Sequence, residues 1–277
     1  MKKFLELTPL PGEMLKPREL IDIRGIGHLT LQDRRVYNTL LEHAMGPELG
    51  KDGHIFEVET SVFGLHDAYM SSRDLEVSLE RLMQTIVLVI SSDGAVRERV
   101  QLVGTTKLDM RGTRGTLFYR FPSELAGLLR DATIFAKLDK EILKAFSSKY
   151  ALTLYEALSR RLRLNHRLEE FTVERMRDLL GVDEGALNET KHLNSRAIQP
   201  AFEEVNAITN IHATVVPRKK GRKIVSWLVG WDEKDPTSTA EAMREQQRPR
   251  VGRRARLSGT AEYPVTESVI DGASDND

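Results

Sequence analysis

The sequence of 277 residues contains no cysteine. This absence excludes disulfide bonds, thiolate zinc sites and cysteine nucleophiles, and it fits the reducing cytoplasm, where we expect the protein to act. Long apolar runs are also absent. The run Ile86–Ile90 is a buried strand at most, because a membrane helix needs about 18 apolar residues. The start, Met1–Glu6, has no extended apolar segment, so we expect neither a signal peptide nor a membrane span.

The chain carries no net charge either. Lys and Arg number 41, as do Asp and Glu. This balance argues weakly against a nucleic-acid-binding role, because such domains are often basic overall. The local distribution of cations is more informative than their sum, since charges are screened over about 10 Å.

Motifs for catalysis and metal binding are missing. The segment Gly46–Asp52 resembles a phosphate-binding loop, but its glycine spacing is one residue short and Asp52 replaces the magnesium-binding Ser or Thr. The seven histidines form no HExxH motif, and there is no GxSxG nucleophile motif. Tyr155 is better explained by helix packing than by DNA nicking. We therefore expect no metal, no cofactor and no enzymatic activity.

Cations and a helical pattern meet in the stretch Lys191–Trp231. One apolar stripe at helical spacing predicts a helix, and it consists of Leu193, Ala197, Ile198, Ala201, Phe202, Val205 and Ile208. Two β-rich runs then flank a basic tip around Gly221, which predicts a hairpin. A helix beside a charged hairpin describes a winged helix-turn-helix that binds DNA. The alternative is a helix and hairpin of any α+β domain with a solvated basic turn.

The first half of the chain repeats this order of elements. Capping signals at Thr30–Asp33 and Ser71–Asp74 predict two helices, and strands and a hairpin turn follow the second one. The second half begins with a long helical pattern over Asp139–Leu164 and a capped helix over Thr172–Gly181. Although the halves share no clear residue repeat, this order predicts an α+β fold of two tandem winged-helix domains.

The expected boundaries follow from changes in composition. We expect an irregular N-terminal segment over residues 1–29, a first winged-helix domain over 30–135, a second over 136–232 and a disordered tail over 233–277. The tail is poor in large apolar residues and cannot offset its ordering entropy. Its basic cluster, Arg248–Arg256, either adds non-specific phosphate contacts or is simply solvated.

Three segments resemble one protein family, the initiator proteins of iteron-type, theta-replicating plasmids. Ser148–Leu158 is similar to the opening helix of that family's second domain, and Phe171–Gly181 to its helix ending in Leu-Gly. Asn194–Asn206, followed by Lys219–Lys223, resembles its recognition helix and wing. The resemblance covers residues 148–231, whereas residues 30–130 match in pattern only.

This resemblance implies a tandem winged-helix protein of the bacterial cytoplasm. It implies binding as a monomer to directly repeated sites (iterons) in double-stranded plasmid DNA, and help in melting an AT-rich segment. The implied partners are the host initiator, the replicative helicase and a second copy of the chain, because family members repress their own gene as dimers through the first domain. The competing interpretations are a winged-helix transcriptional repressor and an interaction scaffold without DNA affinity.

The predicted DNA contacts lie mainly in the second domain. Asn194 suits adenine and Arg196 suits guanine, because each side chain can form paired hydrogen bonds to its base. We expect Lys191 and Ser195 to hold phosphate. Pro200 complicates this assignment, because its ring clashes with the carbonyl of residue 196 inside a regular helix. The helix therefore either begins later or is kinked at this point.

Phosphate contacts are predicted at the wing and at scattered arginines. The wing cations are Lys219, Lys220, Arg222 and Lys223. The further candidates are Arg160 and Arg161 and, in the first domain, Arg73, Arg81, Arg111 and Arg114. Two winged helices on one face of the duplex, about one helical turn apart, predict a site of roughly twenty base pairs.

Overall fold

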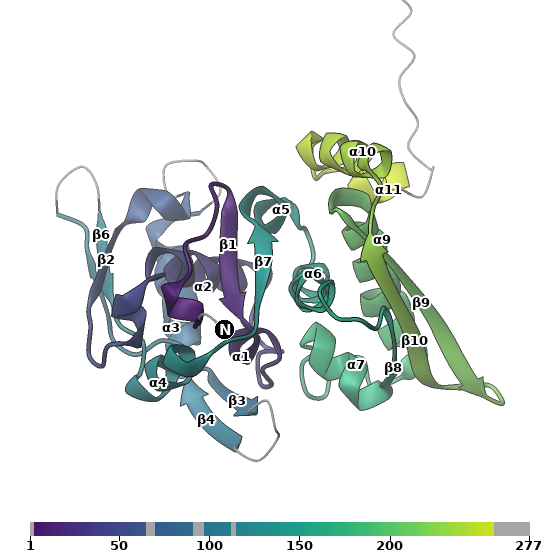
Figure 1. Ribbon diagram of the computed structural model, residues 1–277, viewed down its shortest axis with the longest axis horizontal. Coiled ribbons are helices and arrows are strands. Elements are labelled where there is room, and N and C mark those ends of the chain that lie inside the picture. Colours follow the sequence, from purple (N-terminus) through teal and green to yellow (C-terminus); the bar gives the residue numbers. More distant parts are fainter. Residues whose placement is uncertain (1–2, 65–69, 91–96, 112–114, 258–277) are drawn as a thin grey trace, which may run out of the picture.

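The computed structural model describes residues 3–64, 70–90, 97–111 and 115–257 (Figure 1). They form two α+β units that lie side by side, with helix α6 (Lys149–Arg161) between them. No helix in these ranges is both long and apolar enough to cross a membrane.

The first unit contains a three-stranded antiparallel sheet and the helices that cover it. Its main elements are α2 (Leu31–His43), β2 (Phe56–Glu59), α3 (Ser72–Gln84), β5 (Thr106–Asp109), β6 (Thr116–Tyr119) and α4 (Ser123–Asp131). Shorter elements are η1 (Phe4–Glu6), η2 (Pro47–Gly50), η3 (Thr60–Phe63) and the hairpin strands β3 (Ile86–Ile90) and β4 (Arg97–Gln101). Reciprocal capping boxes at Thr30 with Asp33 and at Ser71 with Asp74 start α2 and α3, which confirms both predicted starts.

The second unit follows the same plan. After α6 come β8 (Leu168–Thr172), α7 (Val173–Leu180), α8 (Thr190–Leu193), η4 (Asn194–Ile198), α9 (Gln199–Ile208), β9 (Ile211–Lys220) and β10 (Lys223–Glu233). The strand order is β8-β10-β9 here and β2-β6-β5 in the first unit. In both sheets the strand that precedes the helices pairs with the last strand of the hairpin. This shared topology confirms two tandem winged-helix domains.

The N-terminal segment corrects one prediction. Residues 1–29 were expected to be irregular, but β1 (Glu13–Pro17) pairs antiparallel with β7 (Phe135–Asp139), and α1 (Arg18–Ile21) follows it. Most of the prolines and glycines that indicated irregular structure lie outside this strand and Pro17 is its last residue, while its hydrogen-bonding partner lies at the far end of the first domain. From β7 the chain enters α5 (Lys140–Ala145) and then α6.

The C-terminal segment corrects another. A disordered tail was expected over 233–277, but residues 236–257 fold into α10 (Pro236–Gln247) and α11 (Arg253–Leu257). Asp235 caps α10 by accepting hydrogen bonds from the backbone amides of Thr237 and Ser238. The composition argument failed because this segment is anchored by buried charge rather than by apolar area. Residues 258–277 lie outside the described part of the chain.

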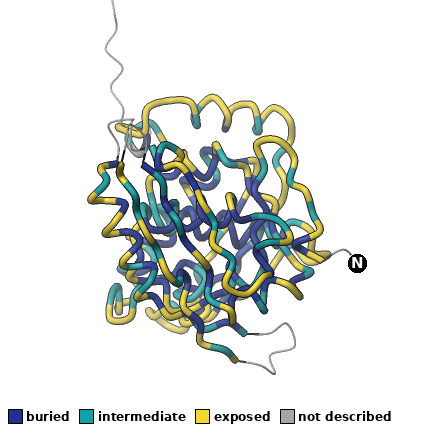
Figure 2. The backbone as a smooth tube through the Cα atoms, turned by 90° about the vertical axis from the view of Figure 1, so that its left-hand side faces the viewer, coloured by how far each residue is buried: buried dark blue, intermediate teal, exposed yellow. Residues whose placement is uncertain are grey.

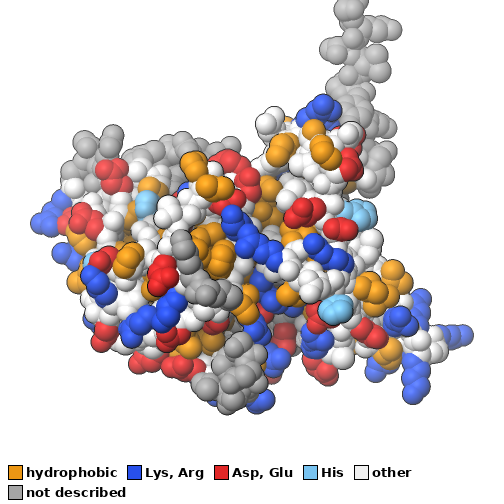
Figure 3. Space-filling view, viewed as in Figure 1, with side chains coloured by type: hydrophobic (Ala, Val, Ile, Leu, Met, Phe, Trp, Pro, Cys, Tyr) orange, Lys and Arg blue, Asp and Glu red, His pale blue; other side chains and the backbone are white. Residues whose placement is uncertain are grey.

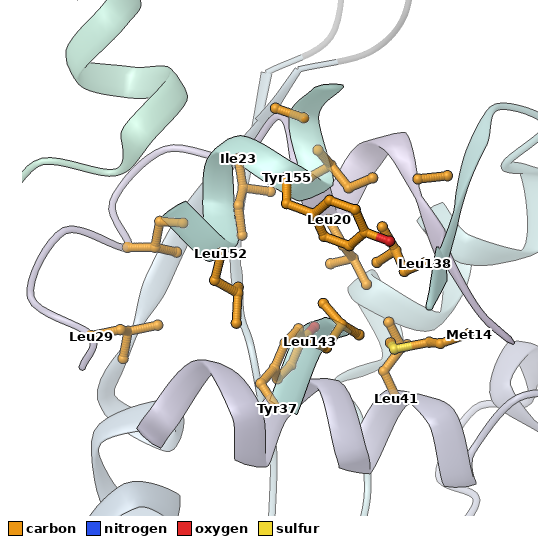
Figure 4. Close-up of a cluster of buried hydrophobic side chains, with 14 of the residues drawn as sticks. Met14, Leu20, Ile23, Leu29, Tyr37, Leu41, Leu138, Leu143, Leu152 and Tyr155 are labelled. Atoms are coloured by element: carbon orange, nitrogen blue, oxygen red, sulfur yellow. The ribbon is translucent and has the colours of Figure 1, made fainter. Parts of the chain in front are cut away.

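One continuous apolar core runs through both units. Figure 2 shows the buried backbone passing through the centre of the molecule. Figure 4 shows side chains from β1, β7, α2 and α6 converging, among them Met14, Leu138, Leu41, Leu152 and Tyr155. Burial raises the pKa of Tyr155 to about 12, and its hydroxyl accepts a hydrogen bond from the amide of Asp139 at 3.1 Å. Helix α6 therefore belongs to the cores of both domains.

A buried polar cluster crosses the same junction. The Nζ atom of Lys16 in β1 lies 2.8 and 2.9 Å from the carboxylate oxygens of Glu156 in α6, and it donates to Oδ1 of Asn38 in α2 at 2.9 Å. Asn38 in turn donates from Nδ2 to Glu156 at 2.9 Å. Burial lowers the pKa of Lys16, and the neighbouring Glu156 opposes this shift. Each charge is compensated only as long as the three elements stay together.

We expect Glu156→Leu to lower the free energy of unfolding by about 3–5 kcal/mol, because it leaves the Lys16 ammonium buried without a counter-charge. The double variant Lys16→Met/Glu156→Leu should recover part of this loss, with Asn38 left unpaired. Urea unfolding measures both values. Glu174→Leu, at an exposed position of α7, is the control. If Glu156→Leu lowered the free energy of unfolding as little as the control does, the buried pairing of Glu156 with Lys16 would be contradicted.

Candidate nucleic-acid interface

The predicted recognition helix is continuous from Thr190 to Ile208, and it contains one widened turn. Within η4 the backbone amide of Gln199 donates to the carbonyl of Asn194, five residues earlier, which is a π-helical bond. Pro200 follows immediately, in the first turn of α9, where it has no N–H to contribute. The helix therefore neither starts late nor stops at the proline, because the π turn accommodates the ring.

The outer face of this helix carries three of the predicted contacts. Lys191, Ser195 and Arg196 are exposed, whereas Leu193 and Ala197 are fully buried against the rest of the domain. Residues 191 and 195 are four apart and lie on the same face. The fold thus presents a hydroxyl and two cations together in the direction of solvent.

Asn194 has a different position from the one predicted. It is half-buried, and its Oδ1 accepts a hydrogen bond of 2.9 Å from Nε1 of Trp227, a fully buried residue of β10. Since the amide oxygen already serves this bond, the structure argues against the paired contact with adenine. Asn194 instead fixes the helix to the base of the hairpin, a role that depends on a partner 33 residues away.

The hairpin β9–β10 projects from the second unit as a long arm (Figure 1). Gly221 lies at its tip with a φ of +63°, a conformation that favours glycine. Figure 3 shows lysine and arginine side chains gathered at this tip, at the lower right of the view. The exposed cations are Arg218, Lys219, Lys220, Arg222 and Lys223. Within the described residues none of them is paired with a carboxylate.

Sequence reasoning omitted some exposed cations. Arg218 lies next to the predicted wing residues and belongs to the same basic run. In the first unit Arg97 and Arg99 are exposed on β4, next to α3. The alternation of charge along Arg97–Gln101 was the available signal, since it places both arginines on one face of the strand.

The phosphate contacts predicted for Arg160 and Arg161 are wrong, because both side chains point into the molecule. An Nη atom of Arg160 lies 3.0 Å from the Asp22 carboxylate, and its side chain is only 10% exposed. Arg161 donates to the carbonyl of Ala157 at 3.0 Å and pairs with Glu169 at 3.4 Å. These arginines join α6 to its neighbours and are not available to phosphate.

The first-domain candidates differ in their surroundings. Arg73 is exposed in the first turn of α3. Arg81 binds both carboxylate oxygens of Asp33, at 3.0 and 3.1 Å, and so holds α3 against the start of α2. Arg111 is exposed and paired with Asp109. Arg114 lies outside the described residues.

The charge of Asp33 depends on these contacts. Burial alone would raise its pKa, but hydrogen bonds from Thr30, Ser78 and Arg81 outweigh burial and lower it. Arg81 is therefore partly committed to a structural carboxylate. Among the described residues no group of three or more His, Asp or Glu side chains could hold a metal ion.

Comparison with known families decides the class of protein. The sequence profile described as "Initiator Replication protein, WH1" matches residues 13–159, more than half of the chain. The chain belongs to this family of initiator replication proteins. A second profile, "Initiator Rep protein, WH2", matches residues 172–230, which contain the recognition helix and most of the wing. The resemblance noted in the sequence is confirmed.

Solved structures agree on the fold of this initiator. One match, described as "Crystal structure of Pi initiator protein in complex with iteron DNA", has a TM-score of 0.54 and 16% sequence identity. The match covers 81% of this chain and 98% of that one. A search of curated protein sequences finds no match. Helices α10 and α11 lie beyond both matched regions.

We expect Asn194→Ala and Arg196→Ala to differ in stability. Asn194→Ala should lower the free energy of unfolding by about 1–3 kcal/mol, because it leaves the buried indole N–H of Trp227 without an acceptor. Arg196→Ala, on the exposed face, should change it by less than about 0.5 kcal/mol. Thermal unfolding of both variants measures the difference. Equal losses would contradict the packing role of Asn194.

Proposed function

We propose that this initiator binds directly repeated origin sites, the iterons, in double-stranded plasmid DNA and starts replication there. The observation that carries the proposal is the exposed face of Lys191, Ser195 and Arg196 beside a wing of unpaired cations. Membership of the initiator family supports it, and so does the iteron complex of the similarly folded Pi initiator protein.

The two elements have different tasks in this proposal. The helix Thr190–Ile208 enters the major groove, where the fork of Arg196 reads guanine through O6 and N7. Ser195 and Lys191 hold the adjacent phosphates. The wing lies along the backbone and supplies affinity that depends on salt rather than on sequence.

The first domain adds a second contact to the same duplex. Arg73 at the start of α3, and Arg97 and Arg99 on β4, are exposed cations for this purpose. Two units about one helical turn apart extend the site to roughly twenty base pairs. The interior arginines Arg160 and Arg161 take no part in this contact.

Later steps are proposed from the family resemblance. Binding to several iterons strains an adjacent AT-rich segment, and the bound protein recruits the host initiator and the replicative helicase. A dimer formed through the first domain represses the initiator's own gene. In this scheme the protein acts through binding free energy alone and catalyses no covalent step.

Nuclease footprinting on the plasmid origin tests the proposal. The expected result is protection of tandem repeats of about twenty base pairs, with an inverted repeat protected at concentrations that favour the dimer. Protection of an inverted operator alone, with no repeated origin site, would favour a transcriptional repressor. An absence of any protected DNA would overturn DNA binding.

Lys220→Ala should weaken binding to all DNA sequences to a similar degree. The loss of one phosphate contact should lower the slope of log K against log[salt] by about 0.9. Fluorescence anisotropy over a salt series measures this slope. Lys51→Ala, at an exposed lysine of the first unit that pairs with Glu48, is the matched control. A slope equal to that of the control would contradict the wing assignment.

Arg196→Ala should weaken binding to the specific DNA site only. We expect a loss of about 1–3 kcal/mol on the iteron and little change on unrelated DNA, because the lost bonds go to a base edge. Competition binding with an iteron duplex and an unrelated duplex gives the ratio of the two affinities. Arg244→Ala, at an exposed arginine of α10, is the control. Equal losses on both duplexes would place Arg196 on phosphate instead.

A further inference from the structure

The turn between α5 and α6 is the point where the two domains and the C-terminal segment meet. Helix α5 ends at Ala145, and its last carbonyl groups have no partner within the helix. Side chains from three other elements bind this turn. It therefore fixes the path of the chain from one domain into the next.

Arginines reach the turn from two sides. Arg35 of α2, in the first domain, donates to the carbonyl of Lys144 at 2.9 Å and also to that of Phe146. Arg250 donates to the same Lys144 carbonyl, and Arg253 of α11 donates to the carbonyl of Ala145 at 2.7 Å. Burial, together with the nearby Arg250, lowers the pKa of Arg35 to about 10, so its guanidinium stays charged at neutral pH.

The recognition helix supplies the matching acceptor. Glu204 of α9 accepts hydrogen bonds from the backbone amides of Ser147 at 2.6 Å and Ser148 at 3.1 Å. The guanidinium of Arg253 lies 3.3 Å from the same carboxylate, and both residues are less than 7% exposed. Arg253 thus joins the end of α5 to the helix that carries the proposed DNA contacts.

The rest of the C-terminal segment holds Arg253 in place. Lys234 donates its backbone amide to the carbonyl of Asn210 at 2.8 Å, just beyond α9. Helix α10 then packs against α9 and α5. Near its end, Glu245 pairs with Arg256 at 2.6 Å and lies 3.7 Å from Arg253. Figure 1 shows α10 and α11 at the upper end of α9.

We infer that residues 235–257 form a brace that sets the orientation of the two winged-helix domains on DNA, with Arg253 and Arg250 as its positioning residues. This inference rests on the proposed function. It also extends that function, because the brace lies beyond both matched family regions. Two domains held in a fixed orientation can bind one duplex without losing further conformational entropy at their junction. This raises the affinity for the complete site but not for a site that only one domain contacts.

Pulsed electron–electron distance measurements on the full chain test the orientation directly. Because the sequence has no cysteine, Glu57→Cys in β2 and Glu174→Cys in α7 provide one exposed labelling position in each domain. Arg253→Ala should broaden the distance distribution between the two nitroxides. Arg250→Ala, at an exposed position, should broaden it less and is the variant expected to keep the fold. Arg244→Ala should leave the distribution unchanged.

DNA binding by the same variants supplies the second measurement. Arg253→Ala should bind the complete origin repeat about tenfold more weakly, while its affinity for a shortened duplex covering only the second domain's contacts stays unchanged. Arg253→Lys should restore only part of the affinity, because an ammonium cannot reach both the Ala145 carbonyl and Glu204 as the guanidinium does.

Two results would overturn the brace. One is a wild-type distance distribution and wild-type affinity in both Arg253→Ala and Arg250→Ala. The other is an equal loss on the complete and shortened duplexes, which would show that Arg253 merely stabilises the second domain. If the parent protein binds neither duplex, the proposed function fails, and the distance distributions alone still decide whether residues 235–257 hold the domains in one orientation.

Discussion

The ion pair between Lys16 and Glu156 constrains the whole molecule, because it forms only when β1, α2 and α6 are assembled. Burying these charges costs desolvation free energy that their attraction offsets only in good geometry. The pair therefore penalises any arrangement in which α6 leaves the first domain. Since α6 is also the first helix of the second winged-helix domain, one buried contact links the folding of both units.

Charge pairing in the interior also reconciles the zero net charge of the chain with the proposed binding of DNA. Several interior and junction arginines are paired with carboxylates, as Arg160 is with Asp22 and Arg253 with Glu204. Part of the acidic charge is thus paired in the interior of the molecule. By contrast, the exposed cations of the recognition helix (Lys191 and Arg196) and of the wing have no carboxylate partner among the described residues. A basic surface can therefore exist on a chain of zero total charge, because the field of its cations is screened over about 10 Å.

Local signals were sufficient to predict part of the fold. Capping residues such as Thr30 and Ser71 act over three positions, so their helices could be placed from sequence. The same holds for the basic hairpin around Gly221. Predictions failed where a partner lies far along the chain. The strand β1 pairs with β7, Asn194 with Trp227 and Arg253 with Glu204, and none of these pairings has a local pattern. The wrong predictions in the candidate site, for Asn194, Arg160 and Arg161, likewise come from partners that local patterns do not reveal.

The π turn of η4 is an intermediate case, because its signal was in the sequence. The buried stripe from Leu193 to Ile208 keeps the three- and four-residue steps of a helix on both sides of this turn. The signal is Pro200, which has no N–H for the carbonyl of Arg196 and whose ring clashes with that carbonyl in a regular helix. A widened turn immediately before the proline relieves this clash. It keeps the apolar stripe buried while Lys191, Ser195 and Arg196 stay on the outer face.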